Sequence, residues 1–244
     1  MKNAWVIAKR DLGSFFNSPI FYVVTTVFLV IYSWMFFQIL SEFSSINMQA
    51  AQHIVITISL QNVALVLLML IPVLTMKSFA EEKKSKTIAL LMSSPVRAIE
   101  IVIGKFTACM LVVFIMLFLS SYSVIALLIF GKPELGPILT GYLGLLLMSG
   151  CFISIGVCAS SLTDNQIIAA VLSFGFSLFM WIIQWGTQTA GPELAEVLNY
   201  LSLIDHLNRF LEGIPNSSDF IYYISFIGFC LFLTHRVLDS GRWR

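Results

Sequence analysis

The chain has 244 residues, of which 58% are hydrophobic and only 11% are charged, and its mean hydropathy is +0.91. Soluble domains carry about a quarter charged residues, so this composition predicts a membrane protein with several spans. The net charge is +1 and the basic residues are not gathered on a polar domain, which argues against a nucleic-acid partner.

The first residues of the chain predict an amphipathic helix that lies in the membrane interface. Residues 9–11 are charged and lie largely off the apolar stripe of this helix. An unstructured leader is the alternative interpretation. Pro19 opens the next element, because proline is tolerated in the first turn of a helix. The stripe recurs at steps of three and four residues, at Trp5, Ala8, Leu12 and Phe15.

Six apolar segments are each long enough to cross a bilayer, since a helix that rises about 1.5 Å per residue needs about 20 residues to cross the hydrocarbon core. Between 190 and 214, two short segments each mix apolar and polar residues and are bounded by glycine and proline. They are predicted to be short external helices. The predicted fold class is therefore all-α: a polytopic membrane protein with six transmembrane helices after an interfacial amphipathic helix. The spans are 20–40, 54–75, 106–130, 138–162, 167–185 and 220–238.

The distribution of positive charge predicts the orientation of these spans. Of the 14 lysines and arginines, all but Lys132 and Arg209 lie near the termini or in the segment 76–105. Positive charge stays on the cytoplasmic side of a membrane protein. Both termini and the segment 76–105 are therefore expected in the cytoplasm.

The segment 76–105 is the one densely charged stretch and is predicted to be a cytoplasmic coupling loop. Ile88, Leu91 and Met92 fall on one helical face, and Ser94 and Pro95 end that helix. A short helix of this kind can present apolar side chains to a soluble partner. A solvated loop whose lysines only set the topology would show the same periodicity. The length favours docking, because connections in helical proteins commonly have about 2 to 8 residues.

The run SFAEEKKSKTIALLMSSPVRAIEIVIGKF at 78–106 resembles the loop between the second and third spans of type 2 ATP-binding cassette (ABC) exporter permeases. Further likenesses are the first helix ending at Ser18 and Pro19, SSLTDNQIIAAVLSF at 160–174 and LSLIDHLNRFLEGI at 201–214. The resemblance covers nearly the whole chain. Among these permeases the chain is most similar to the gliding-motility group and to the nitrous-oxide-reductase accessory group.

The resemblance implies a permease subunit that couples ATP hydrolysis, on a separate nucleotide-binding ABC ATPase dimer, to export of an unidentified substrate. It implies that residues 83–93 include the main coupling helix and that 160–166 form a smaller contact. It also implies a second permease copy or paralogue, a central pathway and a place in the bacterial cytoplasmic (inner) membrane. Lys86 departs from the family, in which a small residue such as glycine is common there, so the start of the coupling helix is expected to be stiffer or to pair differently. The implied ATPase-coupling residues are Glu81, Glu82, Lys84, Thr87, Ile88, Leu91, Met92, Asp164 and Asn165.

Catalytic and cofactor sites are not expected on this chain. A phosphate-binding loop needs GxxxxGK[ST], and the sequence around Gly104 and Lys105 has Ile99 in place of the first glycine and Phe106 at the last position. ATP and Mg²⁺ are therefore expected on the partner subunit. The histidines lie in separate segments without HxxxH spacing, so no metal site is predicted.

Two other functions fit a chain with six spans. An ion-coupled secondary transporter usually keeps an ionisable group at mid-membrane, and no predicted span has Lys, Arg, Asp or Glu near its middle. This absence argues against ion coupling. A membrane anchor for an ATPase that energises another envelope machine, such as gliding or secretion, without solute flux, predicts the same pattern and remains an alternative.

Overall fold

The computed structural model describes residues 2–43, 48–87, 96–130, 133–187 and 191–241, and the structural statements below refer to these residues. In this part of the chain every regular element is a helix. Six of the described helical segments are long and apolar enough to cross a membrane. The all-α fold with six spans that the sequence predicts is therefore confirmed.

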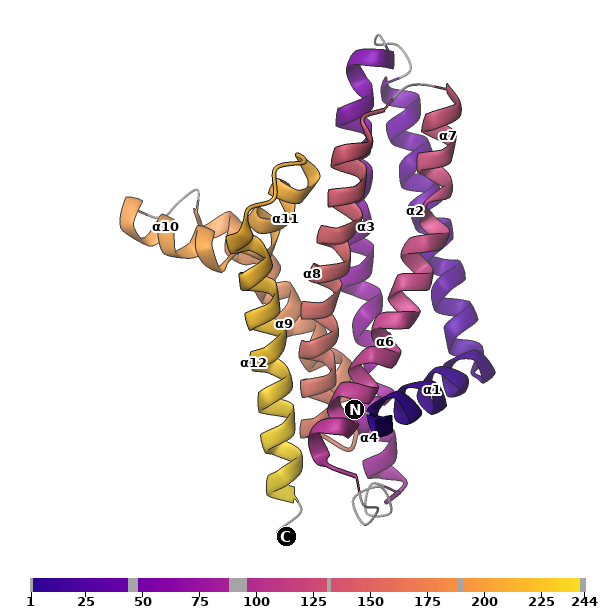
Figure 1. The fold of residues 1–244 in the computed structure, drawn as a ribbon, viewed down its shortest axis with the longest axis vertical. Coiled ribbons are helices and arrows are strands. Elements are labelled where there is room, and N and C mark those ends of the chain that lie inside the picture. Colours follow the sequence, from indigo (N-terminus) through magenta and orange to yellow (C-terminus); the bar gives the residue numbers. More distant parts are fainter. Residues whose placement is uncertain (1, 44–47, 88–95, 131–132, 188–190, 242–244) are drawn as a thin grey trace.

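The chain begins with α1 (Lys2–Asn17), which lies across one end of the molecule before α2 (Pro19–Phe43) runs along its length (Figure 1). The buried face of α1 carries Ala4, Ile7 and Ala8 and packs on the third span. Trp5, another residue of the predicted apolar stripe, lies off this packed face and is 62% exposed. The contact is close because Gly104 has no side chain: a Cβ there would lie 2.8 Å from the Ala4 carbonyl oxygen.

The second span is formed by α3 (Met48–Thr75), and α4 (Lys77–Lys84) follows it almost without interruption. Pro72 lies inside the last turns of α3, where it has no N–H to donate. The Met76 N–H donates to the Pro72 carbonyl oxygen at 3.0 Å, which carries the chain from α3 into α4. Much of the predicted coupling loop up to Lys84 is therefore helical.

The third span consists of α6 (Ala98–Ser120) and α7 (Tyr122–Phe130), separated by Ser121. This corrects the predicted boundary, because the helix begins at Ala98 and not at Phe106. The Glu100 carboxylate accepts from the Arg97 N–H at 3.2 Å, which satisfies a backbone donor at the helix start. The charges that suggested a loop thus belong partly to the first turns of α6.

The centre of the bundle is α8 (Leu135–Leu162), which contacts α3, α4, α6, α9, α11 and α12. In its most apolar stretch 78% of the residues are buried, against 17% for α9 (Gln166–Thr187). Gly144 faces α11, where a Cβ would lie 2.6 Å from Phe210, and Gly141 faces Leu60 of α3 as well as Leu211 of α11. These glycines let the neighbouring helices approach the α8 backbone closely.

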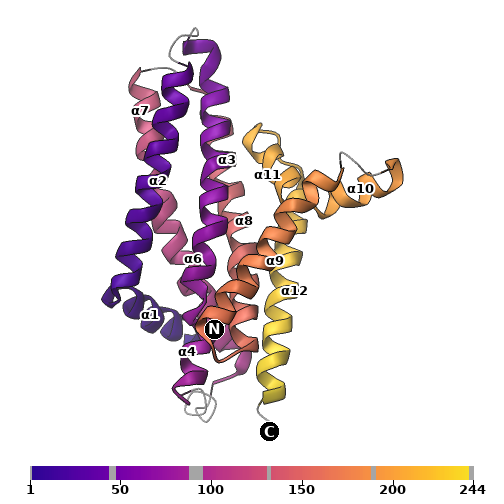
Figure 2. The same ribbon diagram turned by 180° about the vertical axis from the view of Figure 1, so that it is seen from behind.

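Two short helices, α10 (Pro192–Leu201) and α11 (Leu203–Leu211), connect α9 to the last span, α12 (Ser217–Gly241). Ser202 begins α11, because its hydroxyl accepts from the Asp205 N–H at 3.2 Å. Figure 2 shows α10 and α11 away from α4, whereas the start of α1 and the end of α12 lie toward α4. We call these two regions the α4 end and the α11 end.

Candidate coupling site

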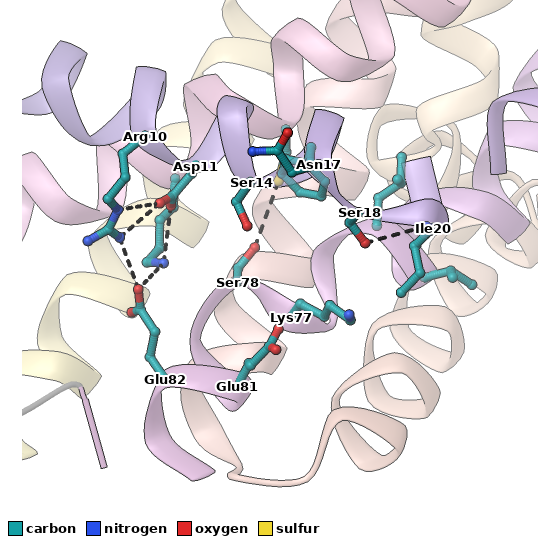
Figure 3. Close-up of a pocket in the computed structure, with 15 residues that line it drawn as sticks. Arg10, Asp11, Ser14, Asn17, Ser18, Ile20, Lys77, Ser78, Glu81 and Glu82 are labelled. Atoms are coloured by element: carbon teal, nitrogen blue, oxygen red, sulfur yellow. Dashed lines mark hydrogen bonds and ion pairs between the residues drawn. The ribbon is translucent and has the colours of Figure 1, made fainter. Parts of the chain in front are cut away.

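An ion network of four residues, Arg10, Asp11, Glu82 and Lys105, joins three helices at the α4 end. The Lys105 ammonium lies 3.2 Å from Asp11 Oδ2 and 2.9 Å from Glu82 Oε1. Arg10 lies 2.8 Å from Asp11 and 3.0 Å from Glu82, as the dashed lines in Figure 3 show. The network therefore connects α1, α4 and α6.

Lys105 is the buried member of this ion network. Its side chain is only 4% exposed, and its ammonium lies 5.1 Å from the centre of the Phe79 ring. The sequence placed Lys105 at the end of a loop, which is wrong, because the residue lies inside α6. A buried ammonium is costly unless it is paired, and the two carboxylates supply that pairing.

Arg10 is the exposed cation of the network. Its partial burial alone would lower the pKa of the guanidinium. The hydrogen bond and charge of Asp11, and then those of Glu82, outweigh this effect and raise the pKa above its usual value. Two cations and two carboxylates thus balance one another, and each carboxylate lies between both cations.

The start of α4 is held by Ser160, a residue of α8. The Ser160 hydroxyl accepts from the N–H groups of Phe79 at 2.9 Å and Ala80 at 3.0 Å, and it donates to the Met76 carbonyl oxygen at 3.0 Å. The first N–H groups of a helix have no partner within the helix, so a side chain from another helix satisfies two of them here. Lys83 also donates to the Ser161 carbonyl oxygen.

These contacts bring together the two segments that the resemblance implied for coupling, namely the chain after the second span and the chain after the fourth. Glu82 lies in the ion network. Asn165 accepts from the Ile167 N–H at 2.9 Å and so begins α9. The remaining described coupling residues, all exposed, are Glu81, Lys84, Thr87 and Asp164.

Ile88, Leu91 and Met92, the predicted docking face, lie outside the described residues. The residues that sequence reasoning missed are Arg10, Asp11 and Lys105, and Ser160 was included in the implied contact 160–166 but not named as a coupling residue. One signal was available for Lys105, which is a single charge directly beside an apolar run of span length. No comparable signal marks Ser160, because serine is common in membrane helices.

Lys86 follows the end of α4 with a φ of 58°. Its N–H donates to the Lys83 carbonyl oxygen at 3.0 Å, and the Ser85 N–H donates to the Glu81 carbonyl oxygen at the same distance. This is the left-handed position that commonly ends a helix and that favours glycine. The lysine therefore occupies a strained position at the point where the sequence departs from the family pattern.

A cavity of 540 Å³ lies beside the ion network, between α1 and the α3–α4 junction (Figure 3). Its walls combine apolar side chains such as Phe15 and Leu74 with polar ones such as Ser14 and Lys77. In the described chain no group of three or more His, Cys, Asp or Glu residues could hold a metal ion. The site thus offers charge pairing and space beside α4, and the residues that line it form no catalytic arrangement.

A second polar cluster, which we call the Asp219 cluster, lies at the α11 end. The fully buried Asp219 carboxylate lies 2.6 Å from His206 Nδ1 and accepts from Arg209 at 2.7 Å and from the Asn216 N–H at 2.8 Å. The His206 ring stacks on Tyr222 with ring centres 4.1 Å apart. These contacts fasten α11 to the start of α12.

The fold and the coupling site describe a helical membrane protein whose polar residues hold helix ends together. The sequence matches the model of the family described as ABC-2 family transporter protein over residues 5–237, and the chain belongs to this family. No protein with a curated description matches the chain significantly. The family is that of the membrane permease subunits of ABC transporters, which are not themselves catalytic. This match does not distinguish the gliding-motility group from the nitrous-oxide-reductase accessory group.

Proposed function

We propose that this chain is the permease subunit of an ATP-driven exporter in the bacterial cytoplasmic membrane, with both termini and the α4 end in the cytoplasm. A separate ABC ATPase dimer would bind ATP and Mg²⁺ and dock at the α4 end. The observation that carries the proposal is the Ser160 contact, which fixes α4 against the chain that leads into the α8–α9 turn. The positive charge near the termini and around α4 supports the orientation.

The ion network gives the ATPase a route into the membrane. A partner that moves α4 also moves Glu82, and with it the paired side chains on α1 and α6. The partner shifts the permease between two states only if it binds one of them more tightly. A second permease copy or paralogue would complete a central pathway, through which the substrate is exported.

Docking is tested by reversing the exposed charges of α4. The double variant Glu81→Lys with Lys84→Glu is co-expressed with a candidate ABC ATPase from the same organism, and the amount of ATPase that co-purifies is measured. We expect the amount of co-purified ATPase to fall at least tenfold, because the reversed charges of α4 then meet charges of the same sign on the ATPase surface. Glu196→Lys, an exposed charge change on α10, is the control and should leave association intact. Equal association in both variants would contradict docking at α4.

Transmission is tested separately with Lys105→Met. Without the Lys105 ammonium, Arg10 is the remaining cation that pairs with the Asp11 and Glu82 carboxylates. We expect the ATPase to bind normally but its stimulation by the permease in liposomes to fall about fivefold or more, since allosteric coupling is typically worth about 1 to 3 kcal/mol. Full stimulation would rule out the ion network as the route. Stimulated ATPase activity without flux of any candidate substrate would favour the membrane anchor over the exporter.

A further inference from the structure

An apolar groove of 530 Å³ runs between α6 and α12 near the α4 end. Ile99 and Ile103 of α6 form one wall, and Leu231 and Phe232 of α12 form the other. Gly228 also lines the groove, and a Cβ there would meet no atom within 4 Å. The groove is therefore open at Gly228 and deep enough to take a hydrocarbon chain alongside two membrane-spanning helices.

Arg236 stands at one end of this groove. Its guanidinium carbon lies 5.1 Å from the centre of the Phe232 ring, so the cation covers the aromatic face at the groove. Arg10 and Arg209 each pair with a carboxylate, whereas Arg236 has no ion-pair partner among the described residues. His235, which also lines the groove, stands beside it. The donors of Arg236 are thus available to a ligand.

We propose that the groove binds one anionic phospholipid, with an acyl chain between α6 and α12 and the phosphate on Arg236. A guanidinium presents several N–H donors in a plane that matches phosphate oxygens, and it remains charged at every physiological pH. Basic pockets between spans on the cytoplasmic side attract anionic headgroups. The site rests on the proposed orientation, with the α4 end in the cytoplasm, and it does not depend on the ATPase partner.

The lipid headgroup determines which phospholipid this site prefers. A lipid tail in the groove and a lipid tail in the bilayer have nearly the same apolar surroundings, so the chain adds little selectivity. A headgroup without an ammonium leaves the phosphate to Arg236 alone, whereas a choline group places a second cation beside it. Phosphatidylglycerol is therefore expected to bind more tightly than phosphatidylcholine with the same acyl chains.

The experiment measures lipid binding to the detergent-purified protein by native mass spectrometry, with these two lipids as probes. Arg236→Gln is expected to weaken phosphatidylglycerol binding about tenfold, because hydrogen bonds to charged groups are worth about 1.5 to 3 kcal/mol. Binding of phosphatidylcholine should change much less. Lys9→Gln, which removes an exposed cation on α1, is the matched control and should have no effect. Equal losses in the two variants would show a general charge effect and overturn the proposal.

The chain-binding part is tested with Gly228→Leu, which puts an apolar side chain into the groove at a position where a Cβ has no atom within 4 Å. We expect binding of both lipids to fall, while Gly175→Leu on α9, another glycine with open space around it, leaves binding unchanged. Thermal unfolding of each variant confirms that it is folded. Glycerol 3-phosphate should fail to compete with phosphatidylglycerol. Effective competition, or equal effects of the two leucine variants, would overturn a lipid site in this groove.

Discussion

The two ends of the molecule hold their helices together in different ways. At the α11 end, the Asp219 cluster draws on a short stretch of chain, because its partners are His206, Arg209 and Asn216. At the α4 end, the ion network draws on α1, α4 and α6, and Lys105 is separated from Asp11 by 94 positions in the sequence. The first arrangement is local and buried, and the second is distributed and partly exposed.

This difference matches the proposed function, in which the α11 end is rigid and the α4 end transmits movement of the ATPase. The Asp219 carboxylate is fully buried and surrounded by donors, so α11 and the start of α12 move as one body. The ion network borders a 540 Å³ cavity, which gives α4 space to shift against α1. Substitutions at the two ends should therefore have different consequences: loss of stability at the α11 end and loss of communication at the α4 end.

The largest effect is expected from Asp219→Asn. The variant leaves Arg209 and His206 without their carboxylate, and breaking a buried ion pair typically costs about 3 to 5 kcal/mol. Denaturant unfolding in detergent should show this loss in the free energy of unfolding. Under conditions in which the variant is folded, it should still bind the ATPase. Glu212→Gln, at the exposed end of α11, is the control and should change stability little. If the variant has an unfolding free energy close to that of the native chain, the Asp219 cluster does not stabilise the α11 end.

A smaller loss is expected from Ser160→Ala at the α4 end. The variant leaves the Phe79 and Ala80 N–H groups without their acceptor, and an unsatisfied buried group costs about 1 to 3 kcal/mol. Amide hydrogen exchange should quicken at these two positions. Ser161→Ala provides a matched control, because the Ser161 hydroxyl donates only to Cys158 within its own helix. Equal exchange in the two variants would mean that Ser160 does not hold α4.

The smallest effect, with the opposite sign, is expected from Lys86→Gly. A left-handed conformation costs a side-chain-bearing residue about 1 to 2 kcal/mol, of which the flexibility of glycine in the unfolded chain offsets about 0.5 to 1 kcal/mol. The end of α4 should therefore gain stability and exchange its amides more slowly. Lys84→Gly, at the last residue of α4, should instead lose stability by up to about 0.5 to 1 kcal/mol. If both variants lower stability, Lys86 is not strained.

The sequence predicts the fold well because its strongest signal is the length of each apolar run. All six spans and the two short helices before the last span are present. The start of α6 was misplaced because Arg97, Glu100 and Lys105 make the segment look like a loop. Lys105 enters the bundle only because Asp11 and Glu82 neutralise it, and no local pattern reveals partners that are distant in sequence.

The candidate site is less predictable than the fold for a similar reason. The resemblance named α4 residues and the α8–α9 turn, but only the three-dimensional arrangement shows that Ser160 joins them. Of the predicted apolar stripe of α1, Ala8 is buried and Trp5 is exposed, and the close packing of α1 depends on the absence of a side chain on Gly104. Helical periodicity identifies an apolar face, and the shape of the neighbour selects which part of it is covered.

The central place of α8 also constrains how the protein is made. Synthesis proceeds from the N-terminus, so α3, α4 and α6 leave the ribosome before α8, which all three contact, has been made. Ser160 cannot hold the start of α4 until α8 is made, and the close contact at Gly144 forms only after α11 follows. Before α8 is made, α1 can pack on α6 and α2 on α3, but α3 and α6 lack the helix that both of them contact. A translocon or insertase that keeps these spans together until α8 emerges would raise the yield of folded protein.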